Sequence, residues 1–342
     1  MTPAPGDGPS SHLATNQDPA PTNNDRPATN HDRAATNDDR VPPTDDGAPP
    51  TGEDLAAALP THSLGTARMT DGTTLRTLHW EPAAEPWALA EVVHGLGEHG
   101  GRYETVAVAL TGAGIDTWAY DHRGNGGSGG RRGHIDRWQI LHDDLEARIR
   151  GVEATRPGLP LVLWGHSLGG LIACGYVLSG QDRPLPDVLV LSSPALDDDL
   201  AGWRRSIAPI AARIVPRMRV PHGLPEGGLS RDPSVEERTA TDPMCGTAST
   251  TRFGAEAFAE QDRLRGVLAD LTAMPVPTYV FHGSADPIVP VRASAVFDGM
   301  SNVTRVVWDG LRHETHHEPE HAEVLAGAVE WLRATVPAAR AV

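Results

Sequence analysis

Three polar residues, each just past an apolar run of the chain, have the types that a nucleophilic hydrolase needs. Ser167 lies in Gly-His-Ser-Leu-Gly (165–169), a G-x-S-x-G pattern between the apolar run 159–165 and a helical stretch. In that context the pattern predicts a sharp turn that presents the serine at the rim of a sheet. A serine hydroxyl becomes reactive when a base removes its proton, and the base needs an acid to orient it. Asp286 and His313 follow two later apolar runs in the order serine, acid, histidine, so we predict that the three form a catalytic triad.

Acyl transfer also requires two backbone N–H groups that bind the developing oxyanion. With this pattern, one belongs to the residue after the serine and the other to a loop after an earlier strand. Leu168 supplies the first, and Leu96 in the loop VVHGLGEHGGRY offers the second. The glycines of this loop allow main chain to approach the site closely. We therefore predict an oxyanion hole formed by the amides of Leu96 and Leu168.

The stretch LRHETHHEPEH around His313 has a competing interpretation. His313, Glu314 and His317 fit H-E-x-x-H, in which two histidines one helical turn apart bind zinc and the glutamate acts as a base. That chemistry needs a helix through the motif, whereas Pro319 and the preceding strand signal disfavour one. We therefore favour a match by chance and expect no metal. The remaining histidines are expected to face solvent around a helix start: His316, His317 and His321.

A second competing pattern lies in the loop that carries Leu96. Gly95, Gly97 and Gly100 form G-x-G-x-x-G after an apolar run, and Asp121 follows about 20 residues later, as in a dinucleotide-binding fingerprint. That interpretation leaves the serine turn and the serine–acid–histidine order unexplained. We disfavour it, and no organic cofactor is expected.

Short apolar runs alternate with helical stretches along most of the chain. The runs are rich in Val and Leu and are bounded by Gly or Pro, as expected of strands buried on both faces. They cover residues 89–95, 115–121, 159–165, 187–193, 276–283 and 304–310, and an Asp-Gly hairpin signal precedes them at 68–82. This order predicts an α/β fold with a mostly parallel sheet and helices on both faces. The chemistry then belongs beyond the carboxyl ends of the strands.

One segment interrupts the alternation and predicts an inserted helical cap. Residues 197–250 contain no convincing strand and lie between two predicted strands. Within them, residues 201–220 hold five Arg and no acid, with apolar residues at helical spacing. Such a helix covers an acyl tunnel with its apolar side, rests on an anionic membrane, or does both, and the sequence favours neither interpretation.

The composition excludes several other classes of protein. The net charge is −16, of which residues 1–60 contribute −7 and the remainder −9, so no basic surface for nucleic acid is expected. Residues 1–55 hold many Pro and almost no large apolar residue, which predicts a disordered tail before a hydrolase domain at 56–342. Two cysteines are too few for a disulfide framework, and neither a signal peptide nor a membrane span is visible. We expect a soluble cytoplasmic protein.

A set of motifs in fixed order resembles the monoacylglycerol lipase and lysophospholipase branch of the α/β-hydrolases. The motifs are HGLGEHGGRY, YDHRGNGGSGG, WGHSLGG, LSSPAL, RVPHGLPEGGLSRDPSV, TDPM, HGSADPIV and RHE–EPE, and the similarity runs from about residue 64 to residue 333. The resemblance implies the same triad and oxyanion amides as above. It also implies that Glu98 and Arg102 face the polar head of the substrate, although a salt bridge at a helix start is an equal alternative. Asn125 departs from the family pattern, which has His in this turn.

These observations predict a serine hydrolase that cleaves lipid monoesters, with monoacylglycerol as the preferred substrate. A lysophospholipase or a proline-type peptidase on the same fold is the alternative, and a zinc protease or a catalytically silent binding protein is more remote. The sequence leaves acyl-chain length, oligomeric state and the role of the tail open.

Overall fold

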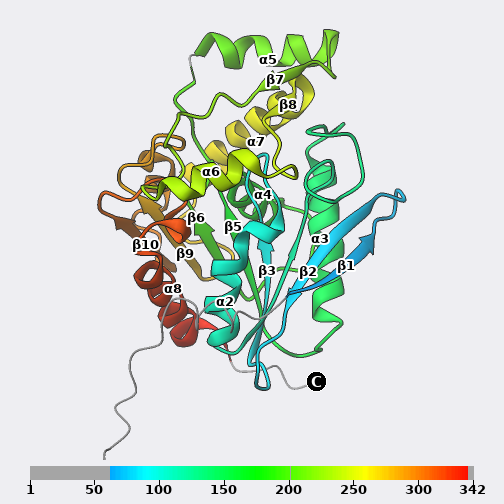
Figure 1. The fold of residues 1–342 in the computed structure, drawn as a ribbon. Coiled ribbons are helices and arrows are strands. Elements are labelled where there is room, and N and C mark those ends of the chain that lie inside the picture. The colour runs from blue at the N-terminus through cyan, green and yellow to red at the C-terminus, as the bar shows by residue number, and fades with distance from the viewer. Residues whose placement is uncertain (1–61, 201, 338–342) are drawn as a thin grey trace, which may run out of the picture. The chain divides into compact units, whose positions relative to one another are not determined.

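A mixed eight-stranded sheet forms the centre of the protein. The computed structural model describes residues 62–200 and 202–337 (Figure 1). The strand order is β1-β2-β4-β3-β5-β6-β9-β10, antiparallel at β1/β2 and β2/β4 and parallel from β4 to β10. The strands are β1 (Ser63–Arg68), β2 (Thr74–Trp80), β3 (Ala88–Val93), β4 (Ile115–Tyr120), β5 (Leu161–His166), β6 (Val188–Ser192), β9 (Thr278–Gly283) and β10 (Val303–Trp308). The predicted mostly parallel sheet is thus confirmed.

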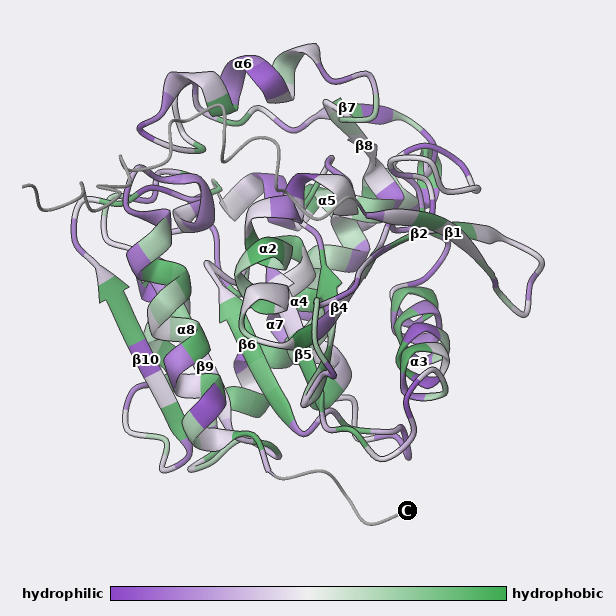
Figure 2. Cartoon of the chain, turned by 60° about the horizontal axis from the view of Figure 1, so that its bottom comes forward, coloured by the Kyte–Doolittle hydropathy of each residue, from purple (hydrophilic) through white to green (hydrophobic). Residues whose placement is uncertain are grey.

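Helices cover both faces of this sheet and enclose two separate cores. α2 (Glu104–Gly112) and α8 (His321–Thr335) pack on one face, where Trp164 and Phe281 are buried. α3 (Gln139–Glu153), α4 (Leu168–Val177) and α7 (Thr251–Ala269) pack on the other. Strands β3, β5, β6 and β9 are buried along their whole length, because both of their faces meet helices. Figure 2 shows the hydrophobic colour along strands such as β6.

The segment between β6 and β9 lies beyond the carboxyl ends of the strands (Figure 1). It contains α5 (Gly202–Ile214), β7 (Arg219–Pro221), α6 (Pro233–Thr241) and β8 (Ala248–Thr250), followed by α7. The expectation that this region lacks strands was wrong, because β7 and β8 form an antiparallel pair. Each has only three residues, too few to produce an alternating pattern.

The predicted tail at residues 1–55 lies outside the described residues. A chain that starts near residue 55 should keep its melting temperature and its turnover, because residues 1–50 hold almost no side chain that could join a core. Thermal unfolding and ester hydrolysis of the shortened and full-length chains would check this. A fall of several degrees in the melting temperature, or a clear loss of turnover, would show that the tail contributes to the fold or the site.

Candidate active site

Ser167 occupies a strained turn between β5 and α4. Its φ of 52° and ψ of −116° lie in a region that side-chain-bearing residues rarely adopt. Glycines on either side make the turn possible, since a Cβ on Gly165 would lie 2.5 Å from the Gly169 oxygen and one on Gly169 would lie 2.0 Å from the Val93 oxygen. The turn is anchored by the Ser167 amide, which donates to the Ser192 carbonyl at 2.9 Å. The serine is therefore fixed at the rim of the sheet and remains 8% exposed.

Asp286 and His313 form a hydrogen-bonded pair in the loops after β9 and β10. Nδ1 of His313 donates to Oδ2 of Asp286 at 2.7 Å. The other carboxylate oxygen accepts the backbone N–H groups of Ile288 and Val289 at 2.8 and 2.9 Å. Burial alone would raise the pKa of Asp286, but the neighbouring His313 and His282 outweigh it and hold the pKa well below the ordinary value. The acid is therefore ionised and rigidly oriented.

His313 is held beside the serine turn. Its ring centroid lies 4.8 Å from that of His166, the residue before Ser167, and its carbonyl accepts a hydrogen bond from Ser193 Oγ at 2.9 Å. Burial would lower the pKa of His313, but the charge and hydrogen bond of Asp286 outweigh it and raise the pKa above 6.5. Because Nδ1 faces Asp286, Nε2 is the nitrogen left for proton exchange. The structure thus brings the three predicted residues to one edge of the sheet.

The loop after β3 lies against Ser167 and orients the amide of Leu96. A Cβ on Gly95 would lie 3.3 Å from Ser167 Cβ. Nε2 of His94 accepts the His122 amide at 2.9 Å, so Nδ1 carries the proton and donates to the Gly95 carbonyl at 2.8 Å. In a trans peptide the N–H points opposite to the carbonyl, so this bond also fixes the direction of the Leu96 N–H.

The two predicted oxyanion amides have no partner within the described parts of the chain. The Leu168 amide is at the first position of α4, where a helix provides no intrahelical acceptor. The Leu96 amide likewise donates to none of the residues in 62–200 or 202–337. Two free donors beside the serine are what an oxyanion hole requires.

Glu98 and Arg102 contact each other and the protein around them. Oε1 of Glu98 accepts the Gly95 amide at 2.5 Å and the Tyr103 hydroxyl at 2.7 Å. Nε of Arg102 lies 3.4 Å from Oε2 of Glu98, and its NH2 group donates to Glu314 at 2.7 and 2.9 Å. The contacts of both side chains thus favour the salt-bridge alternative, and Glu98 holds the loop that carries Leu96 in place.

The expectation that His316, His317 and His321 face solvent was wrong. His316 is 1% exposed and packs against Tyr103 and His166 with ring centroids 5.2 and 4.8 Å apart, while His317 and His321 are half-buried. The segment folds inward because the 3-10 turn η3 (Thr315–His317) carries it under α2 before α8 begins. Burial holds the pKa of His316 well below its ordinary value, so the ring is neutral.

The geometry does not suit a zinc helix. His313 and His317 do not share an α-helix, and Nδ1 of His313 is bound to Asp286. Among the described residues, Glu314, His316 and His317 do cluster closely enough to suggest a metal, as do His99, Asp242 and Cys245. In the first cluster Arg102 already binds Glu314. In the second, Nδ1 of His99 accepts the Gly101 amide, so Nε2 carries the proton and has no lone pair for a metal. Neither donor set fits a metal.

Sequence reasoning missed two residues that hold the pair. His282, four residues before Asp286, donates from Nε2 to the same Oδ2 at 3.0 Å. Ser193 has a φ of 42° and binds the His313 backbone. The HGSAD motif contains His282 and the LSSPAL motif contains Ser193. The motifs alone do not show that the ring of His282 points toward Asp286.

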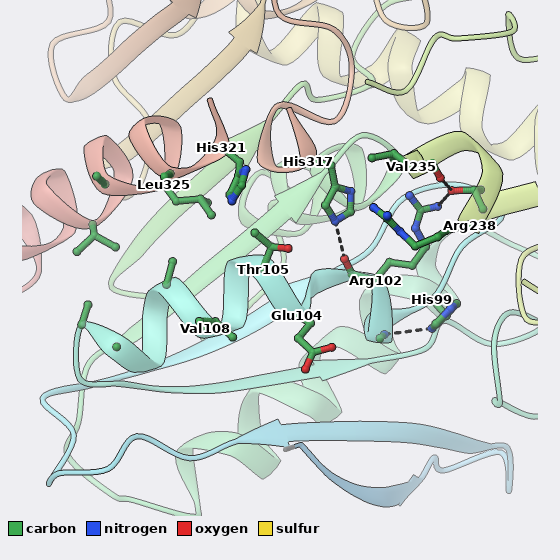
Figure 3. Close-up of a pocket in the computed structure, with 18 of the residues that line it drawn as sticks. His99, Arg102, Glu104, Thr105, Val108, Val235, Arg238, His317, His321 and Leu325 are labelled. Carbon is green, nitrogen blue, oxygen red and sulfur yellow. Dashed lines mark hydrogen bonds between the residues drawn. The ribbon is translucent and has the colours of Figure 1, made fainter. Parts of the chain in front are cut away.

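A cavity of about 900 Å³ lies outside this catalytic constellation (Figure 3). It is bounded by α2, α6 and α8 and is lined by Arg102, Val108, Arg238, His317 and Leu325 among others. Its lining does not include Ser167, Asp286 or His313. Two of its lining residues, Arg102 and His317, also contact Glu314, the residue after His313.

A serine on a strand–turn–helix elbow, with an acid and a histidine past later strands, defines an α/β-hydrolase with a serine nucleophile. Residues 84–320 match the Hydrolase_4 family, described as serine aminopeptidase, S33, and the chain belongs to this family. It is 31% identical over 259 residues to a monoacylglycerol lipase of Mycolicibacterium smegmatis, covering 74% of this chain and 90% of that protein. It is 28% identical over 272 residues to a human monoglyceride lipase, covering 76% and 86%. The crystal structure of a Paleococcus ferrophilus monoacylglycerol lipase superposes with a TM-score of 0.67 at 28% identity, covering 80% and 99%.

Removing the nucleophile or the base should nearly abolish activity. Ser167→Ala and His313→Ala should lower kcat for a soluble ester by roughly 10⁴- to 10⁶-fold, with little change in melting temperature. His317→Ala leaves the three residues in place and should retain far more activity than His313→Ala. Steady-state kinetics and fluorophosphonate labelling would measure this. A His317→Ala variant that is inactive but recovers with added zinc would restore the metalloprotease interpretation.

The pH dependence should follow the histidine. His313 must be neutral to accept the serine proton, and its pKa is raised above 6.5, so kcat/KM should fall as the pH drops through a midpoint above about 6.5. Asp286 stays ionised across this range. The pH profile of kcat/KM for a soluble ester measures the midpoint, and a value well below 6 would contradict this assignment of the base.

Proposed function

We propose that the protein hydrolyses lipid monoesters, with monoacylglycerol cleaved to fatty acid and glycerol. The observation that carries the proposal is the strained Ser167 elbow beside a buried, 2.7 Å Asp286–His313 pair. Relatives named as monoacylglycerol lipases match most of the chain and support the substrate class.

In the proposed mechanism Ser167 attacks the ester carbonyl while Nε2 of His313 takes the hydroxyl proton. Asp286 holds the imidazole tautomer and stabilises the imidazolium that forms. The amides of Leu96 and Leu168 bind the oxyanion, and each such donor contributes roughly 3 kcal/mol to the transition state. His313 then protonates the leaving glycerol, and an acyl-enzyme remains. A water molecule attacks this acyl group with His313 again as the base, and the fatty acid is released.

The charges around the serine favour a neutral head group over a phosphate. Glu98, Glu314 and Arg102 lie together, so the one cation is balanced by two carboxylates. A phosphodiester would meet no unpaired cation within this cluster of three residues and would lose its hydration. His316, in contrast, has two buried ring nitrogens with no partner among the described residues, which suits a hydroxyl-bearing head. This balance favours a monoacylglycerol over a lysophospholipid.

A substrate panel tests this preference. We expect kcat/KM for a monoacylglycerol to exceed that for a lysophospholipid of the same acyl chain by at least tenfold, and aminoacyl amides to be cleaved slowly. Matched acyl chains are the control, because they hold the apolar contribution constant. Equal or faster cleavage of the lysophospholipid would support the lysophospholipase alternative, and rapid release of an N-terminal residue would support a peptidase.

The outer surface of α5 supports a contact with the lipid surface. Trp203, Ile207, Ile210 and Ile214 are 61%, 47%, 59% and 72% exposed, and Ala212 is the only residue of the helix that is buried. An apolar side covering an acyl tunnel would be buried instead. No helix in the described part of the chain is long and apolar enough to cross a bilayer. We propose that α5 rests on an anionic membrane as an interfacial helix.

Arginines around this apolar side provide the electrostatic attraction. Arg204, Arg213 and Arg217 are exposed, whereas Arg205 is bound to Asp198 and Asp262 and is less available to lipid. Each free arginine near an anionic surface contributes roughly 1 kcal/mol, and salt screens it. The contact should therefore weaken strongly as the salt concentration rises.

Sedimentation with anionic vesicles tests the membrane contact. Wild type should sediment at low salt, and a variant with Arg204, Arg213 and Arg217 changed to Gln should sediment much less. A matched variant with Arg137, Arg150 and Arg333 changed to Gln has the same net charge but leaves α5 intact, so it should bind like wild type. If wild type stays in the supernatant at low salt, or both variants behave alike, α5 is not an interfacial helix.

A further inference from the structure

Two residues of the H-E-x-x-H pattern have no role in the proposed mechanism, yet they lie close to His313: Glu314 is buried and His317 is half-buried. Glu314 is 3% exposed and directly follows His313. His317 contacts Glu314 Oε2 through Nδ1 at 2.7 Å and the Arg102 carbonyl through Nε2 at 3.0 Å. Both partners are acceptors, so the ring makes both hydrogen bonds only when both of its nitrogens carry protons.

Glu314 connects three segments that are distant in the sequence. Its carboxylate binds Arg102 at 2.7 and 2.9 Å, and its amide donates to the Leu229 carbonyl at 2.8 Å. Arg102 continues the connection through Glu98 to the Gly95 amide, beside Leu96. Its NH1 group also donates to Thr239 Oγ1 of α6 at 2.6 Å. One buried carboxylate therefore links the histidine loop, the loop of the Leu96 amide and the cap (Figure 3 shows Arg102, His317 and the cap residue Arg238 around this point).

Holding three loops together with a buried ion pair is unfavourable in free energy, because both charges must leave water. Taking two charges out of water costs several kcal/mol per ion, and apolar side chains could fill the same volume. The ion pair also places a negative charge, on Glu314, and a positive charge, on Arg102, near His313. The charged and titratable groups around His313 come from several elements. They are His282 in β9 and Asp286 after it, Glu314, His316 and His317 in the loop of His313, Glu98 and Arg102 after β3, and His166 in β5.

We propose that Glu314 is a positioning residue of the hydrolase, which clamps the loop of His313 to the oxyanion loop through Arg102 and biases the proton affinity of the base. This rests on the proposed function, because it assigns His313 as the base. The negative charge of Glu314 favours the protonated imidazole, and the positive charge of Arg102 opposes it. Burial would raise the pKa of Glu314, but Arg102 and His317 hold it well below its ordinary value, so the carboxylate is charged while the enzyme works.

Two single substitutions at the ends of the ion pair give opposite expectations. Glu314→Gln keeps the shape of the side chain and removes one of the two carboxylates that face Arg102, so the acidic midpoint of kcat/KM should move down by roughly half a unit to one unit. Arg102→Met removes the positive charge that faces Glu314 and Glu98, so the midpoint should move up by a similar amount. Both should lower kcat for a short soluble ester about tenfold or more, because the base and the oxyanion amides lose their alignment.

Two further variants distinguish the effect of charge on the midpoint from the effects of a lost hydrogen bond and of unfolding. Thr239→Val removes the cap hydrogen bond of Arg102 without changing any charge, so the midpoint should stay where it is in wild type. The double variant Arg102→Met with Glu314→Met removes both charges of the pair and leaves Glu98 its hydrogen bonds to Gly95 and Tyr103, so it should melt closer to wild type than Arg102→Met does. Its midpoint should lie between those of the single variants, and its kcat should stay low because the clamp is gone.

The outcomes distinguish this proposal from the proposed function. If wild type hydrolyses esters and labels with a fluorophosphonate, but both single variants shift the midpoint in the same direction or not at all, the clamp is wrong and the triad stands. A double variant with the full wild-type kcat would also overturn the clamp. If wild type neither hydrolyses esters nor labels at Ser167, the proposed function itself fails. Binding of zinc by the wild-type protein, measured with zinc alone, would assign the cluster to a metal instead.

Discussion

The site depends on one backbone conformation, the positive φ of Ser167. A residue with a side chain held there costs on the order of 1–3 kcal/mol, so the surrounding structure must leave the chain no alternative. It does so by close packing: Gly165 and Gly169 leave room for no Cβ, and the buried β5 and α4 fix the directions on both sides of the turn. A larger residue at either glycine would separate β3, β5 and α4, and the serine would lose its place at the rim.

The other residues of the site lie at the same edge of the sheet because they follow parallel strands. Because β3, β5, β6, β9 and β10 run in the same direction, their carboxyl ends meet along one edge, and each contributes one element. The loop after β6 shows how closely these elements are joined. Ser192 accepts the Ser167 amide, and the next residue, Ser193, binds the backbone of His313. Ser167 and His313, the proposed nucleophile and base, are thus attached to neighbouring residues of one strand end, and the backbone sets their separation.

The sequence was sufficient for the parts that depend on local pattern and chain order. Apolar runs bounded by Gly or Pro identified the strands, and the order of Ser167, Asp286 and His313 after three of them placed these residues on one edge before any coordinates were known. It was insufficient wherever a side chain's environment depends on distant segments. His316 and His317 are polar and close to a proline, so they suggested a solvent-exposed loop. His316 is buried and His317 half-buried because Arg102 and Tyr103, over 200 positions earlier, pack against them. The strands β7 and β8 were missed for a related reason, since a three-residue pair is stabilised by its partner rather than by its own pattern.

The predicted cap, between β6 and β9, also contacts the candidate active site. Its Gly246 amide donates to the Gly97 carbonyl at 2.6 Å, one residue after Leu96. Gly97 has a φ of +71°, and a Cβ there would lie 2.3 Å from the Gly246 carbonyl oxygen and 2.7 Å from the ring of His222. Burial lowers the pKa of His222 to about 4, so this contact is made by a neutral ring at ordinary pH and does not loosen by protonation. The Leu96 amide is therefore held from two sides, by Glu98 and His94 within the hydrolase core and by the cap across Gly97. Since α5 belongs to the same cap and exposes its apolar side outward, the surface proposed to meet lipid and the amide proposed to bind the oxyanion are parts of one connected structure.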